Sequence, residues 1–520
     1  MSVSLPPIIS DGMVIQRDAP IRLWGVSDEA VAVSFLDQRA AAEPYADGFW
    51  EIALKPLPYG GPYALSINDQ IITDVYVGDV FLCSGQSNME MTLASACHMY
   101  PEELRASNPF IRQFTVPLRT AFERPERELA GGGWIGASPE TLPFFSSAAY
   151  FFAKRLYEKY RMPIGIIVAA VGGSPIEAWM SRDALKDFPE KLARADRFVD
   201  ASLVENTRSR QQDVSAEFVR SIDRGDPGLS ERWFDPDYDD GAWETRSLMT
   251  PWEGTGSVWF RKTVAVPSGL AGKPATLFLG SVIDIDYTYA NGKMLGGTTN
   301  RYPLREYKIP SLPDGRLTIA MRVISINGGR FIRGKQYILS TREGSLFLDG
   351  DWRFHTGGSG TPPVPQAEGA EPSPGEKPLH YEPTGLYNGM IAPLARSAVK
   401  GMIWYQGESD THSPERYAEQ FAALAQGWRA DWGCDFPIAF VELPHWEEGE
   451  NWDALRAQQR RCLNVPHTAM AAAFDLGEHN DLHPQGKQVI GDRLARCMMR
   501  IAYGERLRVS PFEIVIYKGE

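Results

Sequence analysis

The chain has 520 residues, of which 43% are hydrophobic and 23% are charged, as in ordinary globular proteins. This length exceeds what one compact core usually holds, so we expect two to four domains. The formal net charge of −13 argues against nucleic acid or an anionic membrane as a partner, because both attract clustered Lys and Arg.

The cysteines and the N-terminal residues give indications of the cellular compartment. The five cysteines form no CxxC pair and no spacing typical of a zinc site, which indicates free thiols in a reducing environment. No signal peptide is visible at the start, and no apolar run approaches the roughly 20 residues of a membrane span. We expect a cytoplasmic protein, or a periplasmic or secreted one if a leader preceded this sequence.

The first half of the chain contains two successive kinds of sequence pattern, one typical of β-structure and one of alternating strands and helices. Residues 1–78 contain short alternating stretches broken by Gly, Pro and Asp, which are typical of an antiparallel β-sandwich. Residues 79–230 have an α/β texture. The apolar runs VYVGDVFLCSG and IGIIVAAVGGS predict buried parallel strands, and residues 144–160 between them predict an amphipathic helix.

The second half begins with a predicted insertion. Residues 231–345 show alternating β patterns and the hairpin dipeptide Asn291-Gly292, which predicts a second β-sandwich placed in a surface loop. The Pro/Gly-rich stretch 356–378 predicts an irregular return linker. The α/β texture then resumes within residues 346–520, with helices expected over 415–433 and about 484–503. We therefore expect one α/β domain that is split in sequence.

Ser87 is a candidate nucleophile. It follows a predicted buried strand and the turn residue Gly85, at the start of the next expected helix, where free N–H groups favour an anion. A purely structural role for Ser87, as the cap of that helix, is an equally good interpretation of this segment alone.

His483 is the candidate base among only eight histidines. It precedes the last predicted helix and follows a buried strand, so it belongs to the edge of the sheet where parallel strands deposit their active-site loops. Asp481 is a nearby carboxylate of the kind that orients an imidazole. A helix-start role for this segment stays open, and His479 is a weaker competitor.

Two further strand ends offer groups for an oxyanion. Gly172-Gly173-Ser174 exposes backbone N–H groups, and Gln406 carries a side-chain amide directly after another strand. A tight turn is the simpler interpretation of the glycine pair by itself.

Four segments together resemble the sialate O-acetylesterase family, a branch of the SGNH hydrolases. They are Gly85–Met89, Gly172–Trp179, Trp404–Ser409 and Asp481–Pro484, and Pro383–Met390 is similar to the family's lead-in to its third block. The inserted segment, with Val258–Lys262 and Tyr289–Gly292, is similar to a galactose-binding-like jelly roll. The resemblance implies an SGNH-type, flavodoxin-like α/β/α domain of three layers, with an N-terminal β-sandwich and an inserted β jelly roll.

The resemblance also implies an activity. The chain would be a serine carboxylic-ester hydrolase that removes acetyl groups from sugars, either sialate or oligosaccharides derived from plant polysaccharides. Ser87 would be the nucleophile and His483 the base. The backbone N–H groups of Ser87 and Gly173, the latter in preference to Gly172, and the Gln406 amide would be the oxyanion donors. No metal or organic cofactor is implied.

The acid is the point where the chain departs from the wider superfamily, whose carboxylate lies three residues before the histidine. That position is Asn480 here, so Asp481 is assigned, with Glu408 as the alternative acid or support. A glycoside hydrolase, which needs two carboxylates and no serine nucleophile, and a non-catalytic carbohydrate-binding protein are the competing functions. Nothing in the sequence indicates an oligomeric state.

Overall fold

The structure is a computed structural model that divides the chain into two compact units. One unit comprises Met1–Glu205 and Lys377–Glu520, and the other comprises Asn206–Glu376. The described residues are 3–96, 99–299, 304–333, 335–360, 377–446, 449, 451–477, 482–507 and 513–515, of which 210–216 and 513–515 are described by their backbone alone.

The first unit contains a largely parallel sheet whose strands come from both of its segments. Their bounds are β7 Gln70–Gly85, β8 Asn108–Thr115, β9 Trp134–Ala137, β10 Ile164–Ala170, β21 Gly401–Tyr405, β22 Ile438–Val441, β23 Thr468–Ala471 and β24 Glu513–Val515. The spatial order is β24-β23-β22-β21-β7-β10-β8-β9, with β24 and β9 antiparallel at the two ends. The six strands between them are parallel.

Strand β7 lies where the order of this sheet reverses. The strands that follow β7 directly in the chain, β8 and β10, lie on one side of it, and β21 to β23 lie on the other. Gly85 at its carboxyl end is in register with Ala170 of β10 and Tyr405 of β21. Ligands of open α/β sheets bind at such a switch point, outside the carboxyl ends of the strands.

The N-terminal strands share β7 with the parallel sheet. Strand β6 pairs antiparallel with the first half of β7, β3 pairs with β4 and β6, and β2 pairs with β5. The buried side chains of these strands and of the parallel sheet form one continuous hydrophobic cluster. The bounds are β1 Val14–Gln16, β2 Ile21–Val26, β3 Val31–Phe35, β4 Gln38–Ala42, β5 Phe49–Leu54 and β6 Gly60–Ile67.

Three helices that the sequence predicts are confirmed, with ends that differ by a few residues. They are α2 Ser147–Tyr160, α6 Tyr417–Trp432 and α8 Lys487–Ile501. Helix α2 packs against α8, and α6 packs against α7 Trp452–Arg461. In α2 the predicted apolar face is buried, and the Ser146 hydroxyl caps the helix by accepting from the Ala149 N–H.

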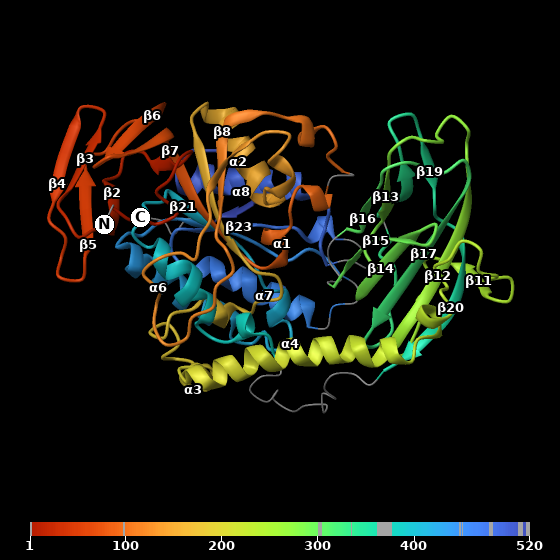
Figure 1. Cartoon of the computed structure of the whole chain (residues 1–520). Coiled ribbons are helices and arrows are strands. Elements are labelled where there is room, and N and C mark those ends of the chain that lie inside the picture. The colour runs from red at the N-terminus through yellow and green to blue at the C-terminus, as the bar shows by residue number, and fades with distance from the viewer. Residues whose placement is uncertain are drawn as a thin grey trace. The chain divides into compact units, whose positions relative to one another are not determined.

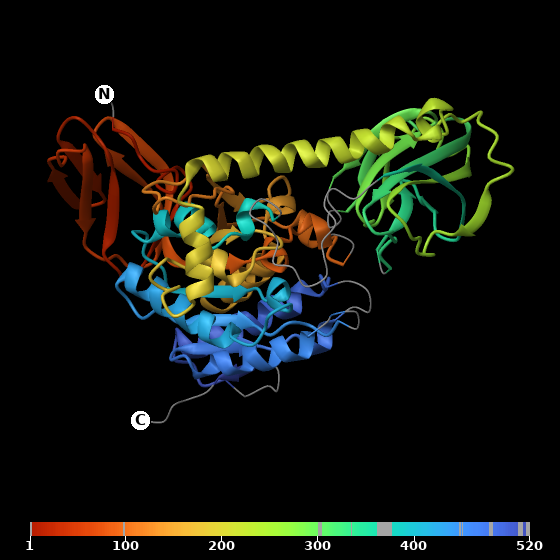
Figure 2. The same cartoon turned by 90° about the horizontal axis from the view of Figure 1, so that it is seen from below.

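The remaining helices are short, with one exception. Helix α4, Ala201–Arg224, is a long continuous helix in Figures 1 and 2, whereas α1 Ser87–Glu90, α3 Pro189–Arg197 and α5 Pro227–Ser230 span one to three turns. Among the described residues, no helix combines the length and the apolar composition that crossing a bilayer requires.

The second unit is built from two antiparallel sheets. Their strand orders are β11-β20-β12-β17-β14-β15 and β16-β13-β18-β19, and the buried side chains of both sheets form one hydrophobic cluster. Asn291 and Gly292 join β14 to β15 with φ values of 43° and 79°, as the predicted hairpin turn requires. The bounds are β11 Glu244–Ser247, β12 Gly256–Val266, β13 Ala275–Leu279, β14 Ile285–Ala290, β15 Lys293–Thr298, β16 Glu306–Ile309, β17 Gly315–Ser325, β18 Tyr337–Ser340, β19 Ser345–Phe347 and β20 Asp351–Ser359.

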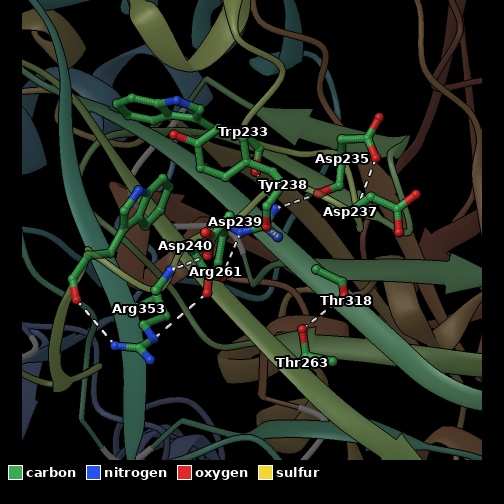
Figure 3. A network of polar contacts seen from close by, with 12 residues as sticks. Trp233, Asp235, Asp237, Tyr238, Asp239, Asp240, Arg261, Thr263, Thr318 and Arg353 are labelled. Atoms are coloured by element: carbon green, nitrogen blue, oxygen red, sulfur yellow. Dashed lines mark hydrogen bonds and ion pairs between the residues drawn. The ribbon is translucent and has the colours of Figure 1, made fainter.

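An acidic segment of this unit is fixed by a buried arginine. The Arg261 guanidinium on β12 donates to the Asp240 carboxylate at 2.9 Å and to the Asp235 carbonyl at 2.9 Å (Figure 3). Arg353 on β20 lies 3.8 Å from the same Asp240 carboxylate and donates to the Trp243 carbonyl at 3.2 Å. Because these charges are paired within the unit, we interpret the segment as a structural clamp on the β-sheet.

The predicted linker is wrong at its beginning. Residues Thr356–Ser359 belong to β20, which pairs with β12 as far as Ser359. The reason is close packing at two glycines. A Cβ atom on Gly357 would lie 2.4 Å from Ser257 Oγ, and one on Gly358 would lie 2.5 Å from the Ile222 carbonyl oxygen. The glycine pair therefore marks a close approach within a strand instead of a turn. Residues 361–376 of the expected linker lie outside the described residues.

Candidate active site

Strand β7 delivers Ser87 through a turn that only glycine fits. Gly85 has a φ of +139°, and a Cβ atom there would lie 2.0 Å from the Tyr405 carbonyl oxygen. The next N–H, that of Gln86, donates to the same carbonyl at 3.0 Å. Ser87 then begins α1, which is a single turn, so local N–H groups and not a long helix dipole are what this segment offers an anion.

The structure brings His483 to Ser87 from a distant part of the chain. His483 lies between β23 and α8, and its Nε2 atom is 2.9 Å from Ser87 Oγ. The imidazole is largely buried, at 7% exposure. This is hydrogen-bond distance between a hydroxyl and a ring nitrogen, which is the geometry of a nucleophile and its base.

Of the two candidate acids, Asp481 and Glu408, only Glu408 lies among the described residues. Asp481 and the competitor base His479 lie outside the described residues. Glu408 is buried, and its Oε1 accepts from the Asn88 amide at 2.5 Å. Burial raises the pKa of the Glu408 carboxyl, while the Asn88 hydrogen bond and the charges of His483 and Lys487 oppose that rise.

Of the two glycines after β10, Gly172 has an N–H group that is hydrogen-bonded within the protein, and Gly173 has one that is not. The Gly172 N–H donates to the Glu90 carboxylate at 2.7 Å. Gly173 has a φ of +77°, and a Cβ atom there would lie 2.1 Å from the Tyr381 hydroxyl oxygen. Within the described part of the chain, the N–H groups of Ser87 and Gly173 donate to no acceptor. These two donors are therefore open to a ligand.

The Gln406 side-chain amide is hydrogen-bonded to groups other than the Ser87 and Gly173 donors. Its Nε2 donates to the Ser174 carbonyl at 3.1 Å and to the Asp410 carboxylate, and its Oε1 accepts from the Tyr417 hydroxyl at 2.9 Å. Burial, followed by the charge of Glu177, raises the pKa of Asp410 to about 7. Gln406 thus has both amide hydrogens in use, unlike the backbone donors.

Asn88 and Lys487 form a buried polar network that the sequence did not point to. The Asn88 amide donates to Glu408 and, at 3.0 Å, to the Leu482 carbonyl, which directly precedes His483. The Asn88 Oδ1 accepts from Lys487 Nζ, and the Lys487 side chain has no exposed surface. A lysine at a helix start reads as a solvated charge, so its burial leaves no sequence signal.

A histidine and a tyrosine from the 3-10 helix Leu379–Tyr381 lie against the glycine pair. The His380 ring hydrogen-bonds the backbone of Gly172, and the ring centroids of His380 and Tyr381 are 4.9 Å apart. Burial lowers the pKa of the His380 imidazole, which favours its neutral form. Neither residue lies in one of the sequence segments that carry the family resemblance.

Known proteins are similar to this chain over most of its length. The family model described as carbohydrate esterase, sialic acid-specific acetylesterase, matches residues 77–205 and 364–500, together more than half of the chain. A sialate O-acetylesterase of Rattus norvegicus is 23% identical over 96% of this chain and 73% of its own length. A sialate O-acetylesterase of Homo sapiens is 28% identical, over 34% of this chain and 39% of its own.

Among solved structures, XAC1771, a carbohydrate acetylesterase from Xanthomonas citri, superposes with a TM-score of 0.59 at 26% sequence identity. The match covers 97% of this chain and 76% of that protein. With the family model matched on both segments that supply the parallel sheet, the chain belongs to the carbohydrate esterase family of sialic acid-specific acetylesterases.

Proposed function

We propose that this carbohydrate O-acetylesterase cleaves acetyl esters of sugars through an acetyl-enzyme formed on Ser87. The observation that carries the proposal is the 2.9 Å contact between His483 Nε2 and Ser87 Oγ beside two unoccupied backbone donors. The imidazole takes the hydroxyl proton as Oγ attacks the acetyl carbonyl carbon. The bond to the sugar oxygen then breaks, and that oxygen receives the proton from His483.

Deacylation repeats the same steps with water. His483 takes a proton from a water molecule as the water oxygen attacks the acetyl carbon, and acetic acid leaves as His483 returns that proton to Ser87 Oγ. His483 and Ser87 are regenerated, the net reaction consumes one water per acetyl group, and the acetic acid ionises to acetate and a proton in solution.

For the oxyanion we propose the N–H groups of Ser87 and Gly173, each worth roughly 3 to 4 kcal/mol in comparable sites. The Gln406 amide remains the third expected donor. It reaches the oxyanion only after releasing the Ser174 carbonyl or the Asp410 carboxylate, to which it is bonded in this structure.

Two carboxylates compete for the role of orienting His483, and replacing them one at a time decides between them. Asp481→Asn or Glu408→Gln should lower kcat by about 10⁴-fold if that residue holds the imidazole, as loss of a triad acid does elsewhere. The other variant should cost much less.

The finer architecture is also a proposal. The parallel strands and paired helices support a three-layer SGNH-type, flavodoxin-like domain in the unit of Met1–Glu205 and Lys377–Glu520, preceded within that unit by a β-sandwich over residues 1–78. The two antiparallel sheets support a galactose-binding-like jelly roll, for which the expected bounds of 231–345 are too narrow because β20, Asp351–Ser359, pairs with β12 in the same sheet. Among the described residues, Cys83, Cys434 and Cys462 form no disulfide, which supports a reducing, cytoplasmic location.

Acetate release from 4-nitrophenyl acetate and from an acetylated oligosaccharide tests the function. Ser87→Ala and His483→Ala should each abolish it without lowering the melting temperature. Ser413→Ala and His412→Ala, the same changes at exposed positions, should leave the rate unchanged. Normal turnover in the Ser87→Ala protein would refute the assignment.

A further inference from the structure

The loop that follows β10 leaves one backbone group of its glycine pair open to a ligand. The Gly172 N–H donates to the Glu90 carboxylate at 2.7 Å. The Gly173 carbonyl accepts from Ser409 Oγ at 2.7 Å, and the backbone of Gly172 also hydrogen-bonds the His380 ring. Within the part of the chain that the structure describes, the Gly173 N–H is the one backbone group of the pair that has no partner. Since backbone groups are normally paired, this N–H marks a position for a ligand atom.

The His380 ring acts on the same peptide unit as this N–H group. Its hydrogen bond opposes the fall in pKa that burial causes, as a bond donated by the ring does, so the backbone acceptor is the Gly172 carbonyl. The Gly172 N–H is itself a donor and is already bonded to Glu90. The Gly172 carbonyl and the Gly173 N–H belong to one planar trans peptide and point in opposite directions. Donation to the carbonyl therefore holds that plane and polarises the N–H on its other side.

Ser409 holds the following peptide unit from the loop after β21. Its hydroxyl donates to the Gly173 carbonyl, and its own N–H donates to the Gln86 side-chain oxygen at 3.3 Å. Gln86 is buried and directly precedes Ser87, so Ser409 ties the glycine pair to the turn that carries the nucleophile. Gly173 has a φ of +77° and no side chain, so its own backbone preferences permit other orientations of its peptides. Hydrogen bonds from outside the loop therefore set the direction of its N–H.

The segment that carries His380 is anchored on both sides. Leu379, which precedes it, belongs to a small buried hydrophobic cluster. Glu382, two residues after it, has no exposed side-chain surface, and its carboxylate accepts from the Arg194 guanidinium at 2.5 and 2.7 Å. A group that orients another must itself be held by packing and hydrogen bonds, and His380 meets this condition.

From these contacts we infer that His380 and Ser409 are positioning residues of the esterase, which hold the glycine pair so that the Gly173 N–H faces the oxyanion formed at Ser87. Both act through the backbone of the glycine pair instead of on the reacting atoms. The inference rests on the proposed function and deepens it, because it names what fixes one oxyanion donor of that same site. The oxygen carries its full charge only after attack, so loss of this positioning lowers kcat and leaves KM nearly unchanged.

Paired variants separate the donated hydrogen bond from the bulk of each side chain. His380→Phe and Ser409→Ala remove the donor, whereas His380→Asn, His380→Gln and Ser409→Thr keep one. With 4-nitrophenyl acetate and with an acetylated oligosaccharide, we expect kcat to fall about tenfold in each variant that lacks the donor, with KM within about twofold of the original. The His380→Phe/Ser409→Ala protein should lose about 100-fold, as when a whole oxyanion donor is removed. Ser409→Thr and at least one of the two amide variants at position 380 should stay within about threefold of the original kcat.

Two further readouts distinguish positioning from a general loss of structure. Methylboronic acid adds to the Ser87 hydroxyl as a tetrahedral anion with the shape of the acetylation intermediate, so its inhibition constant should rise by the factor by which kcat/KM falls. The acidic limb of the pH profile of kcat/KM reports ionisation of the base, His483. This limb should stay at the same pH in every variant, because none of the changes touches His483.

Matched controls and the unaltered enzyme complete the test. His467→Phe and Ser413→Ala make the same changes at exposed positions and should leave kcat unchanged. If the unaltered enzyme releases no acetate, the esterase function itself is rejected. With an active enzyme, a kcat within about twofold of the original in folded His380→Phe or Ser409→Ala overturns the role of that residue. A loss that the donor-keeping variants share, or unchanged inhibition by methylboronic acid, overturns it as well. If His380→Phe does not fold, Ser409→Ala decides on the same criteria.

Discussion

Asn88 connects the loop that carries His483 to the buried carboxylate of Glu408, so replacing Asn88 tests which contacts hold the site together. The amide donates to Glu408 and to the Leu482 carbonyl, and its oxygen accepts from Lys487. Asn88→Ala removes all three contacts without touching Ser87 or His483. We expect a loss of stability and a separate loss of turnover.

The stability loss follows from what remains buried. Within the described part of the chain, the second oxygen of Glu408 already has no hydrogen-bond partner, and Asn88→Ala removes the side-chain donor to the first oxygen. Lys487 Nζ loses an acceptor at the same time. Breaking one side of a buried charged network costs about 3 to 5 kcal/mol. The turnover loss follows from the freed Leu482 carbonyl, because a drift of about 1 Å in the imidazole lowers kcat roughly 100-fold.

Two further variants separate these effects. Asn88→Asp keeps the shape but turns a donor into an acceptor that faces Glu408, and Glu408→Gln supplies a donor in return. The Asn88→Asp/Glu408→Gln protein should regain much of the melting temperature that Asn88→Asp loses, as a double-mutant cycle measures. It should not exceed the kcat of Glu408→Gln alone, because Leu482 still lacks its donor. Wild-type kcat with KM unchanged in Asn88→Ala would refute the positioning role.

Three more predictions come from single contacts. Gly173→Ala, with a φ of +77° and a Cβ atom 2.1 Å from the Tyr381 hydroxyl, should lower kcat/KM at least about 100-fold through loss of an oxyanion donor, and Tyr381→Ala should rescue it only in part. Burial raises the pKa of Asp410 to about 7 in the native state, so the native protein keeps a proton that the unfolded chain releases above pH 3.8. The free energy of unfolding should therefore fall by a few kcal/mol as the pH rises through this range, and denaturant titrations should show a smaller fall in Asp410→Asn. Ser146→Ala removes the cap of α2 and a 2.6 Å bond to the Met89 carbonyl, and calorimetry should show a loss of about 2 kcal/mol.

The sequence predicts the elements that carry the site because their apolar patterns are long and regular. The run that ends at Gly85 and the run that ends at Ala170 are both fully embedded parallel strands, and the helical face of Tyr417, Phe421, Leu424 and Trp428 is buried as its spacing predicts. Ser87 and His483 could be proposed together because both follow strands of one sheet, and parallel strands end at the same edge.

What the sequence could not predict are contacts that depend on three-dimensional neighbours. Gln406 carries an amide in the right motif, but its pairing with Asp410 and Ser174 follows from packing between loops. The burial of Lys487 depends on Asn88, which lies 399 positions away in the chain. The glycines at 357 and 358 look like a turn until the strands that crowd them are known.

The most direct measurement of whether Ser87 and His483 act as one unit is covalent labelling with a fluorophosphonate, followed by peptide mass spectrometry. Such reagents react with a serine hydroxyl only when a base activates it. We predict one adduct per chain, on the peptide that contains Ser87, and its disappearance in His483→Ala. An enzyme that releases acetate from sugars while Ser87 stays unlabelled, or a His483→Ala protein that labels as fast as the original, would contradict a shared role for the two residues.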